Sequence, residues 1–268
     1  MGDSGRTLGR WHLEGAARTD VGKVRKENQD AYGLFPEIGL FLVCDGLGGH
    51  RAGEVASSMV VEEMRRALAV PEHGDLTPIV DGTGRSSVGG RRLVIAIHEA
   101  NERVRLAADD PAHDGMGSTI AALFFDPLYD VVAVSHVGDT RVFRVRGMRI
   151  EQLTEDHTVV QDLVNQGRMT DEDARTSPLR HRITQAVGTA DCVAPSLGLE
   201  VPRAGDVFVL TSDGVHDPVA PTEIAEVVRD ARGDLELVCL RLIDLANLRG
   251  GRDNSTVLVV RCDEPRSG

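Results

Sequence analysis

Short apolar runs bounded by turn residues recur along the chain and predict β-strands. They are rich in β-branched residues and too short for most helices, which is typical of buried strands. The runs lie at residues 39–44, 118–125, 130–137, 206–212 and 255–260. Each is bounded at one end by an aspartate next to Gly, Pro or Asn.

Four other stretches place apolar residues at helical spacing and predict helices at 52–68, 93–107, 223–229 and 235–248. The segment 71–90 is rich in Gly, Pro and Ser and is expected to be a loop. Consecutive strands leave little room for crossover helices, so the pattern favours an α+β fold with antiparallel sheets over a doubly wound sheet. We expect one domain over residues 1–268, with flexible ends at about 1–10 and 263–268.

Composition narrows the possible classes of function. A net charge of −12 argues against wholesale nucleic-acid binding. No apolar run approaches the roughly 20 residues of a membrane span, and the N-terminus has no signal-peptide core. The four cysteines show no CxxC pairing, which disfavours a disulfide framework and a zinc knuckle and suggests a cytoplasmic protein. A basic complement made almost wholly of arginine suggests a bacterial genome rich in G and C.

Four aspartates share a setting that suggests metal chemistry. Asp45, Asp139, Asp213 and Asp253 each lie at the end of an apolar run beside Gly or Asn. One such aspartate is usually a turn residue. Four of them on strand ends favour a hard cation such as magnesium or manganese, and no Cys or His pair joins them as zinc would require.

Eight segments occur in an order and at spacings that resemble a known family. They are TDVGKVRKENQD (19–30), VCDGLGGHRAGEVAS (43–57), GMGST (115–119), HVGDTRVFR (136–144), LTEDH (153–157), ITQAVG (183–188), LTSDGVHD (210–217) and DNSTVLVV (253–260). Together they resemble the metal-dependent protein phosphatases of the protein phosphatase 2C type, in particular the bacterial single-domain members. The resemblance covers about residues 11–262.

The resemblance implies an α-β-β-α sandwich with two antiparallel sheets between helix pairs and a metal site at one end. By matching motif, Asp45 would bridge two ions together with the backbone carbonyl of Gly46. Asp213 and Asp253 would complete the ligands of the first ion, and Asp30 would act through metal-bound water. The implied cofactors are two or three Mn²⁺ or Mg²⁺ ions.

The same resemblance implies further roles. Asp139, with Asp213, matches a third metal position, and Arg25 would hold the substrate phosphate, although an isolated arginine is more often a surface residue. Residues 154–191 correspond to a mobile flap beside the site. Gln29 replaces an acidic residue of many eukaryotic members, so the second ion is expected to keep more waters. The general acid stays open between His50 and water.

The implied reaction is hydrolysis of phosphoserine and phosphothreonine on proteins by metal-activated water, without a phosphoenzyme. Expected partners are phosphorylated proteins, chiefly serine/threonine kinases and their substrates, with no nucleic acid, no membrane span and a monomeric state. Two alternatives keep the fold: a phosphatase for one regulator of a partner-switching pathway, and an inactive binding module. A cysteine phosphatase is disfavoured because no cysteine has an arginine six positions later.

Overall fold

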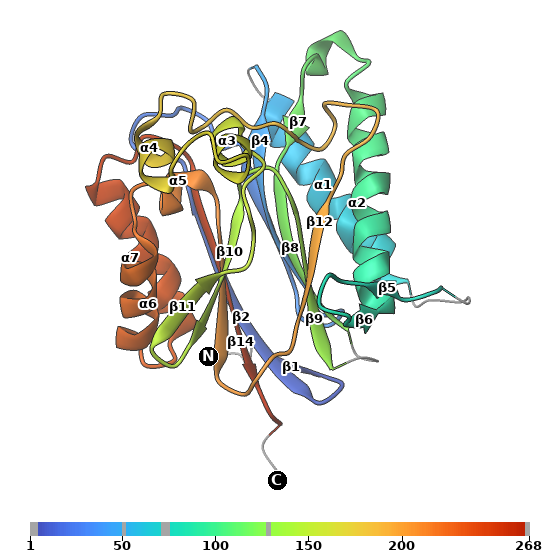
Figure 1. The fold of residues 1–268 in the computed structure, drawn as a ribbon, viewed down its shortest axis with the longest axis vertical. Coiled ribbons are helices and arrows are strands. Elements are labelled where there is room, and N and C mark those ends of the chain that lie inside the picture. The colour runs from blue at the N-terminus through green and yellow to red at the C-terminus, as the bar shows by residue number, and fades with distance from the viewer. Residues whose placement is uncertain (1–4, 50–51, 71–75, 127–129, 266–268) are drawn as a thin grey trace.

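Two antiparallel sheets lie face to face, and each carries a pair of helices on its outer face (Figure 1). The structure is a computed structural model that describes residues 5–49, 52–70, 76–126 and 130–265. The expected α-β-β-α sandwich is confirmed. Among the described residues, no helix is long and apolar enough to cross a membrane.

Both sheets place distant parts of the chain side by side. The order in the first sheet is β1 (Gly5–Leu8), β2 (Trp11–Asp20), β14 (Ser255–Asp263), β13 (Asp206–Thr211), β10 (Arg141–Arg146) and β11 (Arg149–Gln152). The order in the second is β12 (Ser196–Glu200), β9 (Val131–Val137), β8 (Ile120–Asp126), β4 (Leu40–Leu47) and β3 (Asp30–Phe35), with β7 (Gly117–Ser118) paired to β4. The pairing of β2 with β14 brings segments from near both ends of the chain together.

Helices α1 (Ala52–Ala69) and α2 (Val88–Ala107) cover the second sheet, and α6 (Pro221–Asp230) and α7 (Leu235–Leu248) cover the first. In α1 the buried residues recur every four positions, so they lie on one face. They include Ala56, Val60, Met64 and Leu68. Each helix pair therefore closes a separate apolar core against its own sheet.

A third core fills the space between the two sheets, and aromatic rings run through it. Phe41 and Phe125 come from the second sheet and Phe208 from the first. Phe125 meets each of the other two rings edge to face, with centroids 5.9 Å apart in both pairs. Edge-to-face geometry is favoured by the ring quadrupoles, and the contact of Phe125 with Phe208 joins the two sheets directly.

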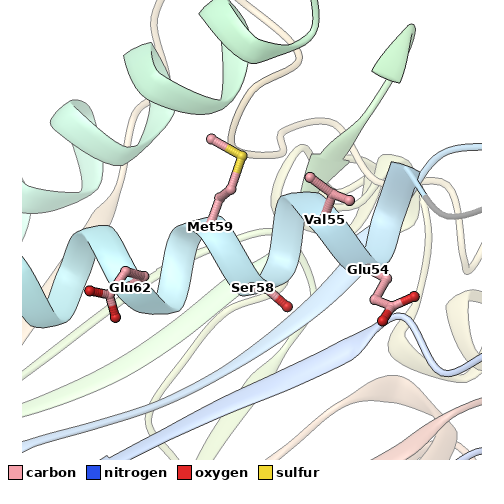
Figure 2. Close-up of a pocket in the computed structure, with 5 residues that line it drawn as sticks. All are labelled: Glu54, Val55, Ser58, Met59 and Glu62. Atoms are coloured by element: carbon pink, nitrogen blue, oxygen red, sulfur yellow. The ribbon is translucent and has the colours of Figure 1, made fainter. Parts of the chain in front are cut away.

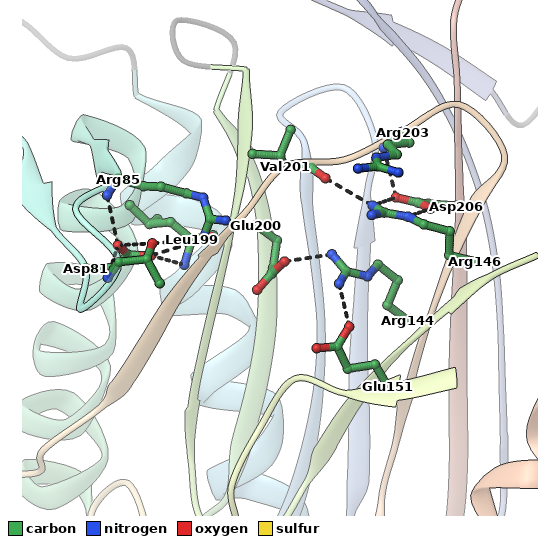
Figure 3. Close-up of polar contacts among 11 residues, drawn as sticks. Asp81, Arg85, Arg144, Arg146, Glu151, Leu199, Glu200, Val201, Arg203 and Asp206 are labelled. Carbon is green, nitrogen blue, oxygen red and sulfur yellow. Dashed lines mark hydrogen bonds and ion pairs between the residues drawn. The ribbon is translucent and has the colours of Figure 1, made fainter. Parts of the chain in front are cut away.

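An arginine network joins the sheets at the end away from α5, α3 and α4 (Figure 3). Arg144 of β10 donates to Glu200 of β12 at 2.6 Å. Arg146 makes a two-pronged contact with Asp206, at 2.6 and 2.5 Å, and Asp206 is fully buried. A bidentate guanidinium satisfies a buried carboxylate that would otherwise be costly.

One sequence-based expectation about the fold is wrong. The segment 71–90 is not wholly a loop, because α2 begins at Val88 and the short strands β5 (Ile79–Val80) and β6 (Ser86–Ser87) precede it. The Ser87 hydroxyl caps the helix by accepting from the Gly90 backbone N–H at 2.8 Å, and it donates to Asp126 at 2.6 Å. Within the end expected to be flexible, residues 5–8 form β1, which pairs with β2.

The polar stretch 154–191, called the flap below, contains two short helices that the periodicity did not predict. They are α3 (Val159–Asn165) and α4 (Asp171–Thr176). Thr158 and Thr170 cap them, accepting from backbone N–H groups three residues later at 3.2 and 3.1 Å. Helices this short take most of their stability from caps and tertiary contacts, which is why their apolar pattern is weak.

Candidate metal centre

Asp30 and Asp45 lie directly opposite each other on neighbouring strands. Asp30 opens β3, Asp45 lies in β4, and the two are register partners. Asp45 was expected just past the end of its strand, but β4 continues to Leu47 because Gly46 and Leu47 pair with β7. A Cβ on Gly46 would lie 2.1 Å from the Gly53 carbonyl oxygen, so only glycine permits this approach of β4 to α1.

The Asp30 carboxylate connects the two sheets. Its Oδ2 accepts hydrogen bonds from the hydroxyls of Ser212 and Thr256, both at 2.7 Å. Ser212 follows β13 and Thr256 lies in β14, so both donors belong to the opposite sheet. Asp30 is thus held between the sheets with its second oxygen, Oδ1, buried and without a hydrogen-bond partner among the described residues.

Asp213 and Asp253 enter from the first sheet. Asp213 begins the short helix α5 (Asp213–His216) after β13, and Asp253 precedes β14. A Cβ on Gly214 would lie 2.0 Å from the Asn254 carbonyl oxygen, so the two segments touch backbone to backbone. Asp213 Oδ1 is also buried without a hydrogen-bond partner among the residues described.

Asp139 lies in the turn between β9 and β10, next to the base of the flap. Gly138 adopts a positive φ of 101°, and its carbonyl accepts from the His157 backbone N–H at 2.9 Å. The Asp139 side chain is buried. The nearby Asp156 forms an ion pair with Arg141, whose Nη2 lies 2.5 Å from Asp156 Oδ2. This turn therefore places the Asp139 carboxylate where the sandwich meets the flap.

The carboxylates raise one another's pKa. Burial is the largest cause of the high pKa of Asp45, followed by repulsion from Asp30, Asp213, Asp139 and Asp253. Burial also raises the pKa of Asp213 well above its usual range, with Asp139 and Asp253 next in effect. Five carboxylates thus share one site, which we call the carboxylate cluster: Asp30, Asp45, Asp139, Asp213 and Asp253.

The same pattern appears at the two more deeply buried members of the carboxylate cluster. Burial raises the pKa of Asp30 to about 6 against the opposing effect of its two hydroxyl donors. Burial likewise raises the pKa of Asp139 to about 6. Buried carboxylates without a cation are costly.

The carboxylate cluster fits hard divalent cations. All its side-chain donors are oxygens, which suit Mg²⁺ and Mn²⁺. The two buried carboxylate oxygens without partners, on Asp30 and Asp213, face the penalty of an unsatisfied charged acceptor. A cation would relieve that penalty together with the mutual repulsion of the carboxylates.

Arg25 lies at the edge of the carboxylate cluster on the loop between β2 and β3. Its Nη2 donates to Asp253 Oδ2 at 2.6 Å, and this bond raises the pKa of the guanidinium further. About half of the Arg25 side chain, 54%, is exposed. Because Arg25 is half exposed beside the carboxylate cluster, its guanidinium has N–H donors available for an incoming phosphate.

Two further polar residues, His181 and Asp217, lie next to Asp213 of the carboxylate cluster. His181 is an exposed residue of the flap, and its Nδ1 lies 3.3 Å from Asp217 Oδ2. Its ligand atom and those of Asp213 and Asp217 lie within 4.8 Å of one another. The signal in the sequence is the spacing of Asp213 and Asp217, four apart in one helical turn.

Two other features lie apart from this chemistry. A hollow of about 450 Å³ follows the surface of α1 (Figure 2) and is lined by Glu54, Val55, Ser58, Met59 and Glu62. Its lining includes no member of the carboxylate cluster and no cation to hold a phosphate. The candidate general acid His50 lies outside the described residues.

Comparisons with known proteins agree with this geometry. Residues 22–233 match the family described as Protein phosphatase 2C. Serine/threonine protein phosphatase PstP of Mycobacterium tuberculosis is 36% identical over 247 residues, covering 92% of this chain and 44% of that protein. Protein phosphatase PhpP of Streptococcus pneumoniae is 31% identical over 258 residues, covering 94% of this chain and 98% of that protein.

The similarity extends to three dimensions. The crystal structure of the catalytic domain of PstP in complex with 2 manganese ions superposes with a TM-score of 0.80 at 32% identity. The superposition covers 95% of this chain and 100% of that one.

Proposed function

Because the chain belongs to the protein phosphatase 2C family of metal-dependent serine/threonine phosphatases, we propose how its own residues perform the reaction. The carboxylate cluster holds divalent ions, Arg25 holds the phosphoryl group, and water attacks phosphorus directly. The observation that carries this proposal is the convergence of five carboxylates from both sheets on one site with two unpartnered buried oxygens.

The matching family motifs assign the ligands within the carboxylate cluster. Two ions would be held by the carboxylates of Asp45, Asp213 and Asp253 and the carbonyl of Gly46, and Asp30 would act through water. Asp139 and Asp213 would hold a third ion. Bound Mn²⁺ or Mg²⁺ supplies Lewis acidity and lowers the pKa of water. The protein positions these ligands on rigid strand ends and balances their charge against the cations.

Arg25 binds and orients the phosphoryl group. In the structure its guanidinium is paired with Asp253, and a second face remains exposed. Two parallel N–H donors match two phosphoryl oxygens and neutralise charge that builds up during transfer. We therefore place the phosphate between Arg25 and the carboxylate cluster.

Direct hydrolysis, without a phosphorylated enzyme, is supported by the burial of two nucleophilic side chains near the site. Cys44 is fully buried in β4, and burial raises the pKa of its thiol, so it stays protonated and inaccessible. Ser212 is also fully buried, and its hydroxyl already donates to Asp30. Neither side chain can reach an incoming phosphate ester.

The proposed substrates are proteins phosphorylated on serine or threonine, namely serine/threonine kinases and their targets. Support comes from the names of PstP and PhpP and from the half-exposed Arg25 at the edge of the site. An inactive binding module is disfavoured because every carboxylate of the cluster is present.

The test is phosphate release from a phosphothreonine peptide with Mn²⁺, with EDTA, and with the Asp45→Asn variant. Asp244→Asn is the matched control, because Asp244 is exposed on α7 and lies away from the carboxylate cluster. We expect turnover that needs Mn²⁺, falls by about 10²-fold or more in Asp45→Asn, and is unchanged in the control. Rapid acid quenching should trap no phosphorylated protein.

Two results would overturn parts of this proposal. Activity that survives both EDTA and Asp45→Asn would refute the metal site. A stable phosphoprotein intermediate would refute direct attack by water while leaving the metal site intact.

A further inference from the structure

We propose that the loop between β2 and β3 binds acidic side chains that flank the phosphorylated residue of the substrate. The docking surface consists of Lys23, Val24 and Lys26 on this loop and Arg252 on the adjoining one. The inference rests on the proposed function and deepens it, because it names the class of protein substrate that the site selects.

The distribution of positive charge is the first observation. The chain has a net charge of −12, yet its only two lysines, Lys23 and Lys26, lie on either side of Arg25. Both lysines are exposed, and neither forms an ion pair within the described part of the chain. Arg25 itself is engaged by Asp253. Two cations are therefore available next to the phosphate-binding arginine.

A third cation comes from the neighbouring loop. Arg252 is exposed and also lacks an ion pair among the residues that the structure describes. The two loops are joined at this point, because the Lys23 backbone N–H donates to the Gly251 carbonyl at 2.7 Å. Lys23 and Arg252 thus belong to one continuous surface beside Asp253.

The loop between β2 and β3 is held in place by hydrogen bonds to one side chain, that of Asn254. The Asn254 side chain accepts from the Gln29 backbone N–H at 2.9 Å and donates to the carbonyls of Val21 and Glu27 at 3.1 and 2.9 Å. Both ends of the loop are therefore fixed to one buried side chain, next to the metal-ligand candidate Asp253.

Close packing fixes the start of the loop as well. Gly22 has a φ of 78°, and a Cβ there would lie 2.4 Å from the Asp253 carbonyl oxygen. The Asp20 carboxylate accepts from the Gly22 backbone N–H at 2.8 Å and from the Asn247 side chain at 3.1 Å. A surface fixed in this way loses little conformational entropy when a partner binds.

The distances suit the residues next to the phosphorylated one. Consecutive Cα atoms are about 3.8 Å apart, so the Cα atoms of Lys23 and Lys26 lie within about 8 Å of that of Arg25. An extended peptide advances about 3.3 Å per residue, so side chains one to three positions from the phosphate reach the docking surface. Val24, with 65% of its surface exposed, offers an apolar contact between the cations.

The experiment compares two phosphothreonine peptides that differ only in having acidic or neutral flanking residues. They are assayed with the wild type, with the double variant Lys23→Gln/Lys26→Gln, and with Arg149→Gln as a control that removes one exposed positive charge elsewhere. Arg149 is exposed at the start of β11, at the opposite end of the sandwich. A small phosphoester, p-nitrophenyl phosphate, reports on the chemical step without any flanking residues.

We expect the wild type to prefer the acidic peptide and the double variant to lose that preference. Exposed charge pairs each contribute modestly, so kcat/KM for the acidic peptide should fall about 5- to 20-fold, mainly through KM. Turnover of the neutral peptide and of p-nitrophenyl phosphate should change by less than about twofold. Raising the salt from about 0.05 M to about 0.5 M should weaken the wild-type preference, because exposed charges are then screened.

The failures are distinguishable. A wild type that hydrolyses the acidic and neutral peptides equally well would overturn the docking surface and leave the phosphatase function standing. An equal loss for both peptides in the double variant would also overturn it, because it would show a structural effect. A wild type that hydrolyses no phosphoester would refute the proposed function itself.

Discussion

Replacing Asp139 by asparagine should stabilise the metal-free protein, although it removes a proposed metal ligand. Burial is the main cause of the raised pKa of Asp139, and repulsion from Asp156 is the next. Near neutral pH the folded, metal-free protein therefore holds a charged Asp139 carboxylate that is less stable there than it is in water. Asparagine has nearly the same shape and no charge, so it removes this cost without opening a cavity.

The size of the effect follows from the pKa. It rises from an ordinary value of 3.8 to about 6 in the folded protein. The difference of about 2 corresponds to about 3 kcal/mol, since each unit of pKa is about 1.4 kcal/mol. We take this as an upper value, because water and structural relaxation lessen such penalties. For a chain of this size it corresponds to a rise in Tm of up to about 6 to 12 °C.

The pH dependence has a definite sign. A folded-state pKa above the unfolded one means that the folded protein binds the proton more tightly, so ionisation destabilises it. The wild type should lose stability relative to the variant as pH rises from about 4 to about 6. The gap should reach roughly half its size at pH 5 and nearly all of it by pH 7.

The assay is thermal denaturation in EDTA at several pH values, with Asp244→Asn as control. Mn²⁺ is then added, and the wild type should gain more stability than Asp139→Asn, because a ligand stabilises the state that binds it. A metal-free variant that is no more stable than the wild type at pH 7.5, or a gap that does not change with pH, would refute the reasoning.

Two further variants test the contacts that hold the carboxylate cluster and the sheets in place. Asn254→Ala should lower the free energy of unfolding by about 2 to 4 kcal/mol, because it removes three hydrogen bonds to backbone groups. Urea denaturation in EDTA measures this, and a loss below about 0.5 kcal/mol would contradict it. Arg146→Met should cost about 3 to 5 kcal/mol, because it leaves the buried Asp206 carboxylate without its cation. Adding Asp206→Asn to Arg146→Met should recover much of that loss in the same assay, and no recovery would show that the ion pair is not the cause.

Much of the fold could be predicted from local patterns. The helix 235–248 agrees with α7 at both ends, because an aspartate cap and an unbroken apolar stripe mark it. The start of α2 at Val88 was missed, because glycines at 89 and 90 suggest a loop when taken alone. Gly89 is needed there for packing, since a Cβ would lie 2.7 Å from the Asp126 carboxylate. Composition cannot reveal such a contact between distant segments.

The candidate site divides in the same way. The aspartates beside glycine or asparagine are visible in the sequence because turn residues mark the ends of apolar strands. Their supporting donors are not visible. Ser212 and Thr256 are 182 and 226 residues from Asp30, and only the packing of one sheet on the other makes them its partners. Asn254 also looks like an ordinary turn residue until its contacts with the β2–β3 loop are known.

The row of phenylalanines between the sheets has a consequence for the chemistry at one end of the molecule. Asp30 and Asp45 belong to one sheet, whereas Asp213 and Asp253 belong to the other. Neither sheet contains a complete site. The distance between the carboxylates of one sheet and those of the other therefore depends on the separation of the two sheets. Replacing these phenylalanines by smaller side chains, far from any carboxylate, would change the distance between the two sheets. Metal binding would then weaken before the protein lost its fold.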